Sequence, residues 1–345
     1  MVVGFARWVA LLCAAGLAWS CSGEDHLVGE LKPTQVLPSP LPGQEPPEGP
    51  GPAPNPTPVE PLPPPAVPVC GNEVFCAVAP MPEAGILKDT WGLSADDFWA
   101  VGPEGVALRW NGTQWNTAAT VTGVRLSGLW GTSAQDVWAV GTGVLHWDGA
   151  AWSREPIQSA HLYDIAGSSD GALWAVGERG AVVRRQAGTW EAVPSGTTVD
   201  LFSVWPFAAD DVWAGGQLGT VLHWNGVVWE SRAPETAGFT VSAFWGFAPN
   251  DLWAATEGGN LFHWDGTAWS LAFQEPTSAP AYFALWGAGP DSLWAVGAGK
   301  VLRRTVSGWQ AAPVQGGITL LGLWGSADQL WAVGYEGSAY VRRGP

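Results

Sequence analysis

Short apolar runs separated by turn residues recur along the chain from Ile86 onward. Each run has about four to seven residues and is bounded by Gly, Asp or Asn, a pattern that predicts β-strands joined by tight turns. In the run 137–140 both alternating positions are apolar. A strand with this pattern is buried on both of its faces. The sequence therefore predicts small sheets that pack face to face.

These runs belong to one unit that is repeated seven times. Of the 25 tryptophans, Trp8 and Trp19 precede residue 21, and the other 23 fall on four positions of the unit. The first position recurs every 36 to 41 residues, at Trp91, Trp130, Ala166, Trp205, Trp245, Trp286 and Trp324. The second is at Trp99, Trp138, Trp174, Trp213, Trp253, Trp294 and Trp331. The third is at Trp110, Trp147, Arg185, Trp224, Trp264, Arg304 and Arg342, and the fourth at Trp115, Trp152, Trp190, Trp229, Trp269 and Trp309.

A unit of about forty residues with four strands is typical of one blade of a β-propeller. We therefore predict an all-β fold, a seven-bladed β-propeller with four-stranded blades. The seventh repeat lacks a fourth strand, but residues 75–80 align with 229–234 of the fourth repeat. We expect a strand near 74–80 to complete the last blade by pairing with 338–343.

The first twenty residues have the pattern of an export signal. Arg7 precedes an apolar stretch at 8–19, which is shorter than the roughly twenty residues that span a bilayer. Residues 17–21 resemble a bacterial lipobox, which predicts a lipoprotein-type signal peptide at 1–20 and lipidation of Cys21. A plain small-x-small cleavage site at 18–20 is the alternative and would release an unanchored chain. We expect an exported protein at the outer membrane or cell surface, where the lipid anchor would be its sole membrane contact. The alternative is a location in the periplasm or the medium.

The segment that follows is rich in proline. Sixteen of the residues from Leu31 to Val69 are Pro, which favours an extended polyproline II chain over helix or sheet. We predict a disordered tether at 21–69 and a propeller domain at 70–345. Cys70 and Cys76 remain as a pair, and in an exported chain we expect them to form a disulfide. A metal site would need more Cys or His nearby.

Charge and motifs narrow the functional classes. The chain has 15 basic and 31 acidic residues, a net charge of −16, which disfavours nucleic-acid binding. No nucleophile elbow, phosphate loop or metal motif is present, so we expect no cofactor and no enzyme activity, with a glycoside hydrolase as a remote alternative. His146, His223 and His263 share one repeat position, which indicates a structural role. The acidic residues at Asp97, Asp136, Asp211 and Asp251 are expected to cap turns by accepting backbone N–H groups.

Three motifs carry a resemblance to known families. Trp-Gly at 130–131, Asp-Val-Trp-Ala-Val-Gly at 136–141 and Trp-Asp-Gly-x-x-Trp at 147–152 resemble bacterial BNR/Asp-box-type propellers and the seven-bladed photosystem II assembly-factor family. The third repeat, at 169–194, is more similar to a tectonin lectin repeat. The resemblance implies a seven-bladed ring and leaves function open, because propellers host many activities.

Residues that vary between repeats are the candidates for function. In propellers the loop between the second and third strands shares a face with the blade-to-blade connections. We expect the protein to be a monomer, and we hypothesise that this mostly acidic face binds an unknown protein. The domain would then be an interaction or assembly platform. The alternative is a lectin that binds a surface glycan. The candidate binding residues are Glu104, Glu178, Arg179, Gln217, Glu257, Tyr335 and Glu336.

Overall fold

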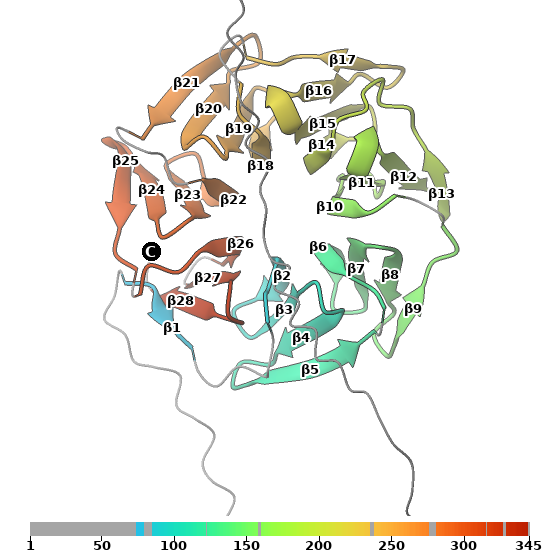
Figure 1. Ribbon diagram of the computed structural model, residues 1–345, viewed down its shortest axis with the longest axis vertical. Helices are drawn as coiled ribbons and strands as arrows, with labels where there is room; N and C mark the ends of the chain where they lie inside the picture. Colours follow the sequence, from blue (N-terminus) through green and yellow to red (C-terminus); the bar gives the residue numbers. More distant parts are fainter. Residues whose placement is uncertain are drawn as a thin grey trace, which may run out of the picture. The chain divides into compact units, whose positions relative to one another are not determined.

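The chain folds into a ring of seven four-stranded antiparallel sheets, which confirms the predicted seven-bladed β-propeller (Figure 1). The computed structural model describes residues 74–78, 85–121, 123–157, 160–234, 238–275, 281–314, 316–326 and 329–343. The predicted signal peptide at 1–20, the tether at 21–69, Cys21 and Cys70 lie outside these residues and stay predictions.

Each blade has four strands, which are numbered here from the centre of the ring to its rim (Figure 1). The first strands are β2 (Asp89–Ser94), β6 (Leu126–Ser133), β10 (Leu162–Gly167), β14 (Leu201–Ala208), β18 (Val241–Ala248), β22 (Tyr282–Gly289) and β26 (Leu320–Gly325). The second strands are β3 (Asp97–Val101), β7 (Asp136–Gly141), β11 (Leu173–Gly177), β15 (Asp211–Gly216), β19 (Asp251–Thr256), β23 (Ser292–Gly297) and β27 (Gln329–Gly334). The third strands are β4 (Val106–Trp110), β8 (Val144–Trp147), β12 (Val182–Gln186), β16 (Val221–Trp224), β20 (Asn260–Trp264), β24 (Val301–Thr305) and β28 (Ala339–Arg343). The outer strands are β5 (Trp115–Thr120), β9 (Trp152–Arg154), β13 (Thr189–Ala192), β17 (Trp229–Ser231), β21 (Trp269–Gln274), β25 (Gly308–Ala312) and, for the seventh blade, β1 (Cys76–Ala77).

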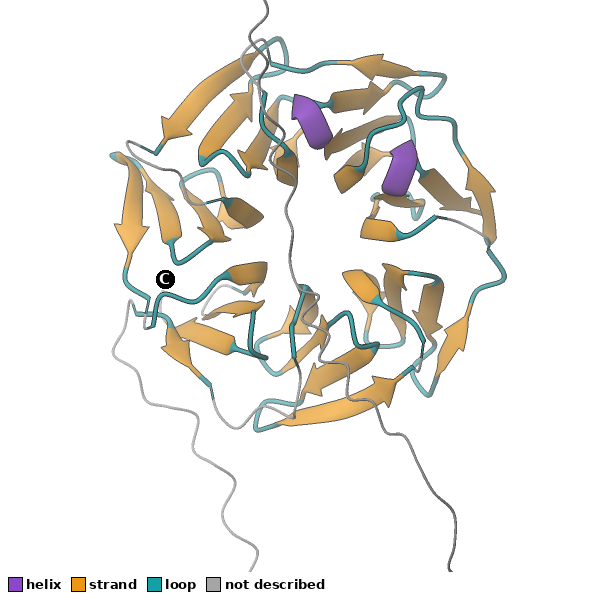
Figure 2. Cartoon of the chain, viewed as in Figure 1, coloured by secondary structure: helices purple, strands orange, loops and turns teal. Residues whose placement is uncertain are grey.

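Helical structure is limited to two short turns in the described part of the chain, η1 (Glu178–Gly180) and η2 (Gln217–Gly219) (Figure 2). Both follow the second strand of a blade. No helix in the described ranges has the length and apolarity needed to cross a bilayer.

The N-terminal strand closes the ring as predicted. In β1, Cys76 pairs with Val341 and Ala77 with Tyr340, so this strand forms the outer edge of the seventh blade. Phe75 is fully buried and meets the Trp294 ring edge-on, with 5.9 Å between ring centroids. Phe75 therefore occupies the position that a fourth-strand Trp holds in the other blades. The Cys70–Cys76 disulfide remains a prediction because Cys70 is outside the described residues.

The tryptophan of each second strand forms the contact between neighbouring blades. Trp99 of the first blade, for example, packs against Trp147 of the second blade at 5.2 Å between ring centroids and meets Trp152 edge-on. In every blade this Trp is covered by a third-strand Trp or Arg of the next blade. The pairs are Trp99–Trp147, Trp138–Arg185, Trp174–Trp224, Trp213–Trp264, Trp253–Arg304, Trp294–Arg342 and Trp331–Trp110. The substitution of Trp by Arg thus keeps the contact as a cation–π interaction.

The histidine and aspartate positions form one structural network with these tryptophans. His146 lies opposite Trp138 in the β7–β8 ladder and stacks on it at 3.9 Å between ring centroids. The Asp136 carboxylate lies 2.8 Å from Nε2 of His146 and accepts the indole N–H of Trp138. The equivalent pairs are Asp97–Arg109, Asp211–His223 and Asp251–His263. The expectation that these aspartates cap turns through backbone N–H groups is therefore wrong, because the facing third-strand side chain provides a closer donor.

Replacement of Phe75 tests the closure. Phe75→Ala removes a fully buried ring from the last blade interface and should lower the free energy of unfolding by about 3–5 kcal/mol. Ala77→Ser is the matched control, because Ala77 is exposed on the same strand and should change stability by less than about 0.5 kcal/mol. Urea denaturation followed by Trp fluorescence measures both values, and equal stability of the two variants would contradict this closure.

Candidate functional site

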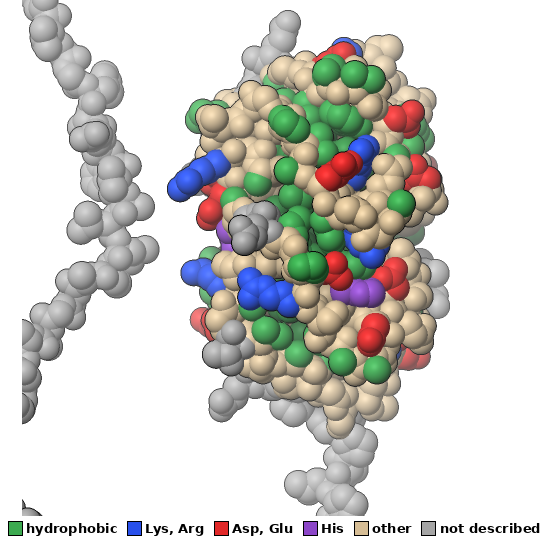
Figure 3. All heavy atoms as spheres, turned by 90° about the vertical axis from the view of Figure 1, so that its right-hand side faces the viewer, with side chains coloured by type: hydrophobic (Ala, Val, Ile, Leu, Met, Phe, Trp, Pro, Cys, Tyr) green, Lys and Arg blue, Asp and Glu red, His purple; other side chains and the backbone are tan. Residues whose placement is uncertain are grey.

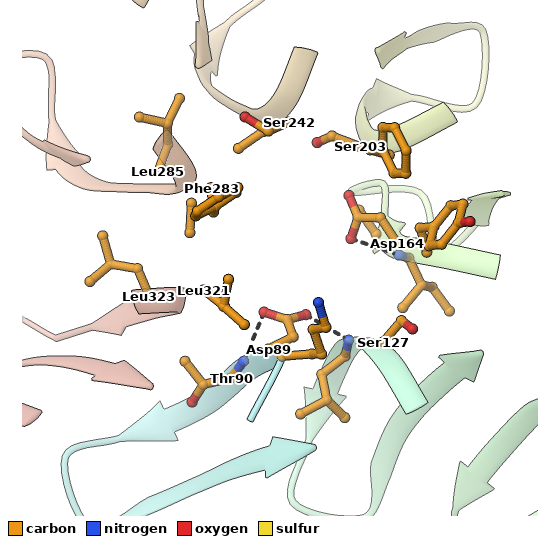
Figure 4. Close-up of a pocket in the computed structure, with 18 of the residues that line it drawn as sticks. Asp89, Thr90, Ser127, Asp164, Ser203, Ser242, Phe283, Leu285, Leu321 and Leu323 are labelled. Carbon is orange, nitrogen blue, oxygen red and sulfur yellow. Dashed lines mark hydrogen bonds between the residues drawn. The ribbon is translucent and has the colours of Figure 1, made fainter. Parts of the chain in front are cut away.

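The first strands surround a cavity of about 670 Å³ at the centre of the ring (Figure 4). The preceding position in each blade, for example Leu126 or Leu320, is fully buried between blades. In blades two to seven the next residue lies at a β-bulge and has no partner residue on the second strand, so its side chain is free to face the cavity. One such residue from each blade lines the cavity: Lys88, Ser127, Tyr163, Phe202, Ser242, Phe283 and Leu321. This position holds five residue types in seven blades, whereas the preceding position is a buried Leu, Val or Tyr in every blade.

One side of the cavity is basic. Lys88 and Arg125 line it together with His161, whose Nε2 lies 3.0 Å from the Ser127 hydroxyl. Burial and the neighbouring Arg125 guanidinium lower the pKa of Lys88. Burial also lowers the pKa of His161, opposed by Glu178 and reinforced by the two cations. Neither Lys88 nor Arg125 forms a salt bridge with any side chain in the described ranges.

Other blades contribute an apolar wall. Phe283 and Leu321 project from β22 and the seventh blade toward the cavity, with Leu285 and Leu323 behind them (Figure 4). Phe202 continues this wall and packs on Tyr163 at 4.8 Å between ring centroids. The cavity is thus amphipathic, with cations on the first two blades and apolar side chains on the sixth and seventh.

Two aspartates connect the cavity wall to the next blade. Asp89 accepts the backbone N–H of Thr90 in its own strand and that of Leu129 in the second blade, both at 2.7 Å. Asp164 makes the same pair of contacts with Ile165 and Val204, both at 2.8 Å. The equivalent residue in the fourth blade is Ser203, which accepts the N–H of Phe244.

Blades without such an acceptor bring their backbones together at this position. An added Cβ on Gly128 or Gly322 would lie about 3 Å from backbone atoms of the next blade's first strand. In the second and seventh blades glycine thus replaces the hydrogen-bonding side chain, and the fifth and sixth blades hold Ala243 and Ala284 there.

The two aspartates are held in an environment that disfavours their charged forms. Burial, and then repulsion from Asp164, raises the pKa of Asp89 to about 7. Burial raises the pKa of Asp164 to about 6. The backbone N–H groups act in the opposite direction and do not compensate for burial. Sequence reasoning missed both residues; the available signal was an acid at a repeat position that otherwise holds only Gly, Ala or Ser.

The predicted binding residues lie around the opening of this cavity. We define the channel-mouth face by the loops between second and third strands, residues 102–105, 142–143, 178–181, 217–220, 257–259, 298–300 and 335–338. These loops hydrogen-bond to the residue before the first strand, as in Glu178 to His161 and Glu257 to Thr240. Glu257 and Tyr335 line the cavity, whereas Glu104, Glu178, Arg179, Gln217 and Glu336 surround it without lining it. Because Lys88 and Arg125 also line the cavity, the site contains both positive and negative charges rather than mostly acidic ones.

Backbone strain is concentrated in the same loops. Arg179, Leu218 and Glu336 adopt φ values of 56°, 57° and 58°, which non-glycine residues rarely adopt. Leu218 is also 77% exposed, so neither its backbone conformation nor the position of its apolar side chain stabilises the folded ring. Strain of this kind is often found at functional sites. Gln217, in contrast, has a structural contact, because its amide donates to the Asp200 carboxylate.

The outer side of the ring has a different character. Acidic side chains are spread over this surface, and groups of basic side chains lie toward its left edge, the near side of Figure 1 (Figure 3). Across the described residues, no three His, Cys, Asp or Glu side chains gather in a geometry that could hold a metal ion.

Comparison with solved structures gives many proteins of the same fold. YCF48 bound to D1 peptide superposes with a TM-score of 0.63 at 19% identity, covering 79% of this chain and 95% of that one. A catalytically inactive virginiamycin B lyase from Staphylococcus aureus with quinupristin has a TM-score of 0.68 at 14% identity, covering 78% and 98%. The WD40 β-propeller domain of Doa1 has a TM-score of 0.68 at 10% identity, covering 79% and 96%.

The similarity extends to the fold alone. It agrees with the predicted resemblance to the photosystem II assembly-factor family at the level of a seven-bladed ring with Trp-rich blades. The similar structures include a lyase as well as propellers of other kinds, so the fold does not decide between binding and catalysis. No protein-family profile and no curated protein matches the sequence.

The buried aspartates predict an unusual dependence of stability on pH. The pKa of Asp89 rises from 3.8 when unfolded to about 7 when folded, so its stabilising contribution is complete at low pH and is lost as pH rises toward 7. Between pH 5 and 8 the loss is at most about 2–3 kcal/mol. In Asp89→Asn this dependence should disappear, so the stability advantage of the natural chain over the variant should shrink from pH 5 to pH 8. Urea denaturation at both pH values measures it, and an advantage that grows with pH would contradict the assignment.

Proposed function

We propose that this protein is a non-catalytic platform that binds another polypeptide on its channel-mouth face. The main support is the cavity position that holds five different residue types in the seven blades: Lys88, Ser127, Tyr163, Phe202, Ser242, Phe283 and Leu321. The second-strand Trp, which builds the ring, is the same residue in every blade. Variation among residues that face one shared cavity is the pattern expected of a binding site on a rigid scaffold.

Exposed apolar side chains on the same face support a protein partner. Leu218 is 77% exposed, Phe239 50% and Tyr335 43%. The Phe239 ring packs on Gly258, where any Cβ would collide with it. Apolar anchors within a polar rim are typical of protein interfaces. YCF48 bound to D1 peptide provides an example of this fold holding a peptide.

A lectin is the weaker alternative. The tectonin-like third repeat motivates it, and sugar rings stack on exposed aromatic side chains. All 23 tryptophans of the repeats lie in the described residues, and each is buried or only partly exposed. The tryptophans of the second, third and fourth positions pack at the ring interfaces. Those of the first position also line the cavity, and none of them is fully exposed: Trp91, Trp130, Trp205, Trp245, Trp286 and Trp324.

We further propose that Cys21 carries a lipid and that the Pro-rich tether holds the platform away from the outer membrane or cell surface. Cys21→Ser should then move the protein from the membrane fraction to the soluble fraction, because the lipid anchor is lost. Cys13→Ser, within the signal segment, is the control and should leave the distribution unchanged. Fractionation with mass analysis of the N-terminal peptide tests this; an unmodified Cys21 in the natural protein would contradict it.

Site-specific photo-crosslinking tests the proposed face. A photoreactive residue at Leu218 should capture a discrete partner on intact cells, because this side chain is exposed beside the cavity. Val227 is the matched control: it is 78% exposed in the same blade but lies at the other end of β16. Crosslinks of equal yield from both positions, or none from Leu218, would contradict the platform.

A further inference from the structure

The basic side of the cavity contains two cations that the ring does not neutralise. Lys88 and Arg125 lie close enough for Arg125 to lower the pKa of Lys88, and no side chain in the described ranges forms a salt bridge with either. The chain has a net charge of −16, so acidic side chains were available to pair with them. Lys88 is partly buried and Arg125 is exposed at the opening, and both line the cavity. Two neighbouring cations that no acidic side chain neutralises favour binding of an anion between them.

We infer that the cavity is a carboxylate-binding site for an apolar segment of the partner polypeptide. The carboxylate binds Lys88 and Arg125, and the adjoining apolar side chains pack on Phe202, Phe283 and Leu321. This inference rests on the proposed platform function and specifies what the channel-mouth face recognises.

The surroundings of the two cations favour a carboxylate over a phosphate. Asp89 and Asp164 line the same cavity, and a dianion would be repelled by them more strongly than a single negative charge. The His161–Ser127 pair provides further polar atoms beside the cations for the second carboxylate oxygen.

The size and lining of the cavity favour a short peptide segment. Its volume of about 670 Å³ is within the range of sites for small ligands and is too small for a folded domain. The apolar wall begins on the seventh blade, which adjoins the first blade that carries Lys88, so an occupant that fills both regions must join an anionic group to apolar groups. An extended chain end with a free carboxylate has this chemistry, and so does an internal Asp or Glu within an apolar segment.

Labelled peptides test the inference on the full exported chain. The probes are octapeptides ending in Leu and Phe in three forms: a free C-terminal carboxylate, the C-terminal amide, and the amide with an internal Asp. Fluorescence anisotropy should show at least tenfold tighter binding of one carboxylate form than of the neutral amide. The form that binds identifies the source of the carboxylate, whereas equal binding of all three forms would overturn the inference.

Paired variants assign the binding to the two cations. Lys88→Gln/Arg125→Gln should weaken binding of the carboxylate peptide at least tenfold, and Lys88→Arg/Arg125→Lys should restore most of it. Arg232→Gln removes a cation from an exposed position directly after the outer strand β17 and should bind like the natural chain. Equal affinity of the two Gln variants would overturn the inference, as would full competition by millimolar inorganic phosphate. Unchanged circular dichroism and melting temperature confirm that each variant is folded.

The failure of this inference and the failure of the platform give different results. If crosslinking at Leu218 persists while no carboxylate preference is found, the platform stands and the carboxylate site is wrong. If Leu218 captures nothing, the platform itself is wrong, whatever the peptides show.

Discussion

The ring depends on one tryptophan in each blade, the second-strand Trp, which packs against a third-strand side chain of the next blade. Trp138, for example, has His146 of its own blade on one side and Arg185 of the next blade on the other. Burial of a Trp contributes at most about 4–6 kcal/mol, so seven such contacts outweigh the few ion pairs of this chain. A blade without a neighbour would expose its Trp, and Phe75 completes the seventh blade so that it covers Trp294 of the sixth. Closure is therefore a condition for stability of every blade.

The tryptophans between the blades stabilise the ring, so the residues that line the cavity contribute less to its stability. The wall of the cavity can then hold Lys88 in one blade and Leu321 in another without loss of the fold. What the inner strands must still provide is a close approach to the next blade, through a side-chain acceptor such as Asp89 or through a glycine such as Gly128. The buried residue, the cavity residue and the residue that meets the next blade follow one another in the same strand, which explains how one repeat supports both structure and recognition.

The fold could be predicted from the sequence because the tryptophan spacing records it directly. The alignment of Phe75 with the fourth tryptophan position also predicted the closing strand correctly. The basic site could not be found in this way: Lys88 follows the buried Leu87, whereas Arg125 precedes the buried Leu126, so the two occupy different repeat positions. They approach each other only because adjacent blades converge at the centre. The role assigned to Asp136 was wrong for a similar reason, since its partner His146 belongs to the facing strand.

The inner wall also couples recognition to the stability of the ring. Asp89 contacts the second blade through Leu129 and lines the cavity beside Lys88, so its charge acts on both. A bound carboxylate adds negative charge to the cavity and thereby favours the protonated form of Asp89. By linkage, protonation of Asp89 must favour the bound carboxylate to the same extent. The protonation state of Asp89 therefore affects both its contact with the second blade and the affinity of the cavity for a carboxylate. The residues responsible, Lys88 and Asp89, are not the same in every repeat.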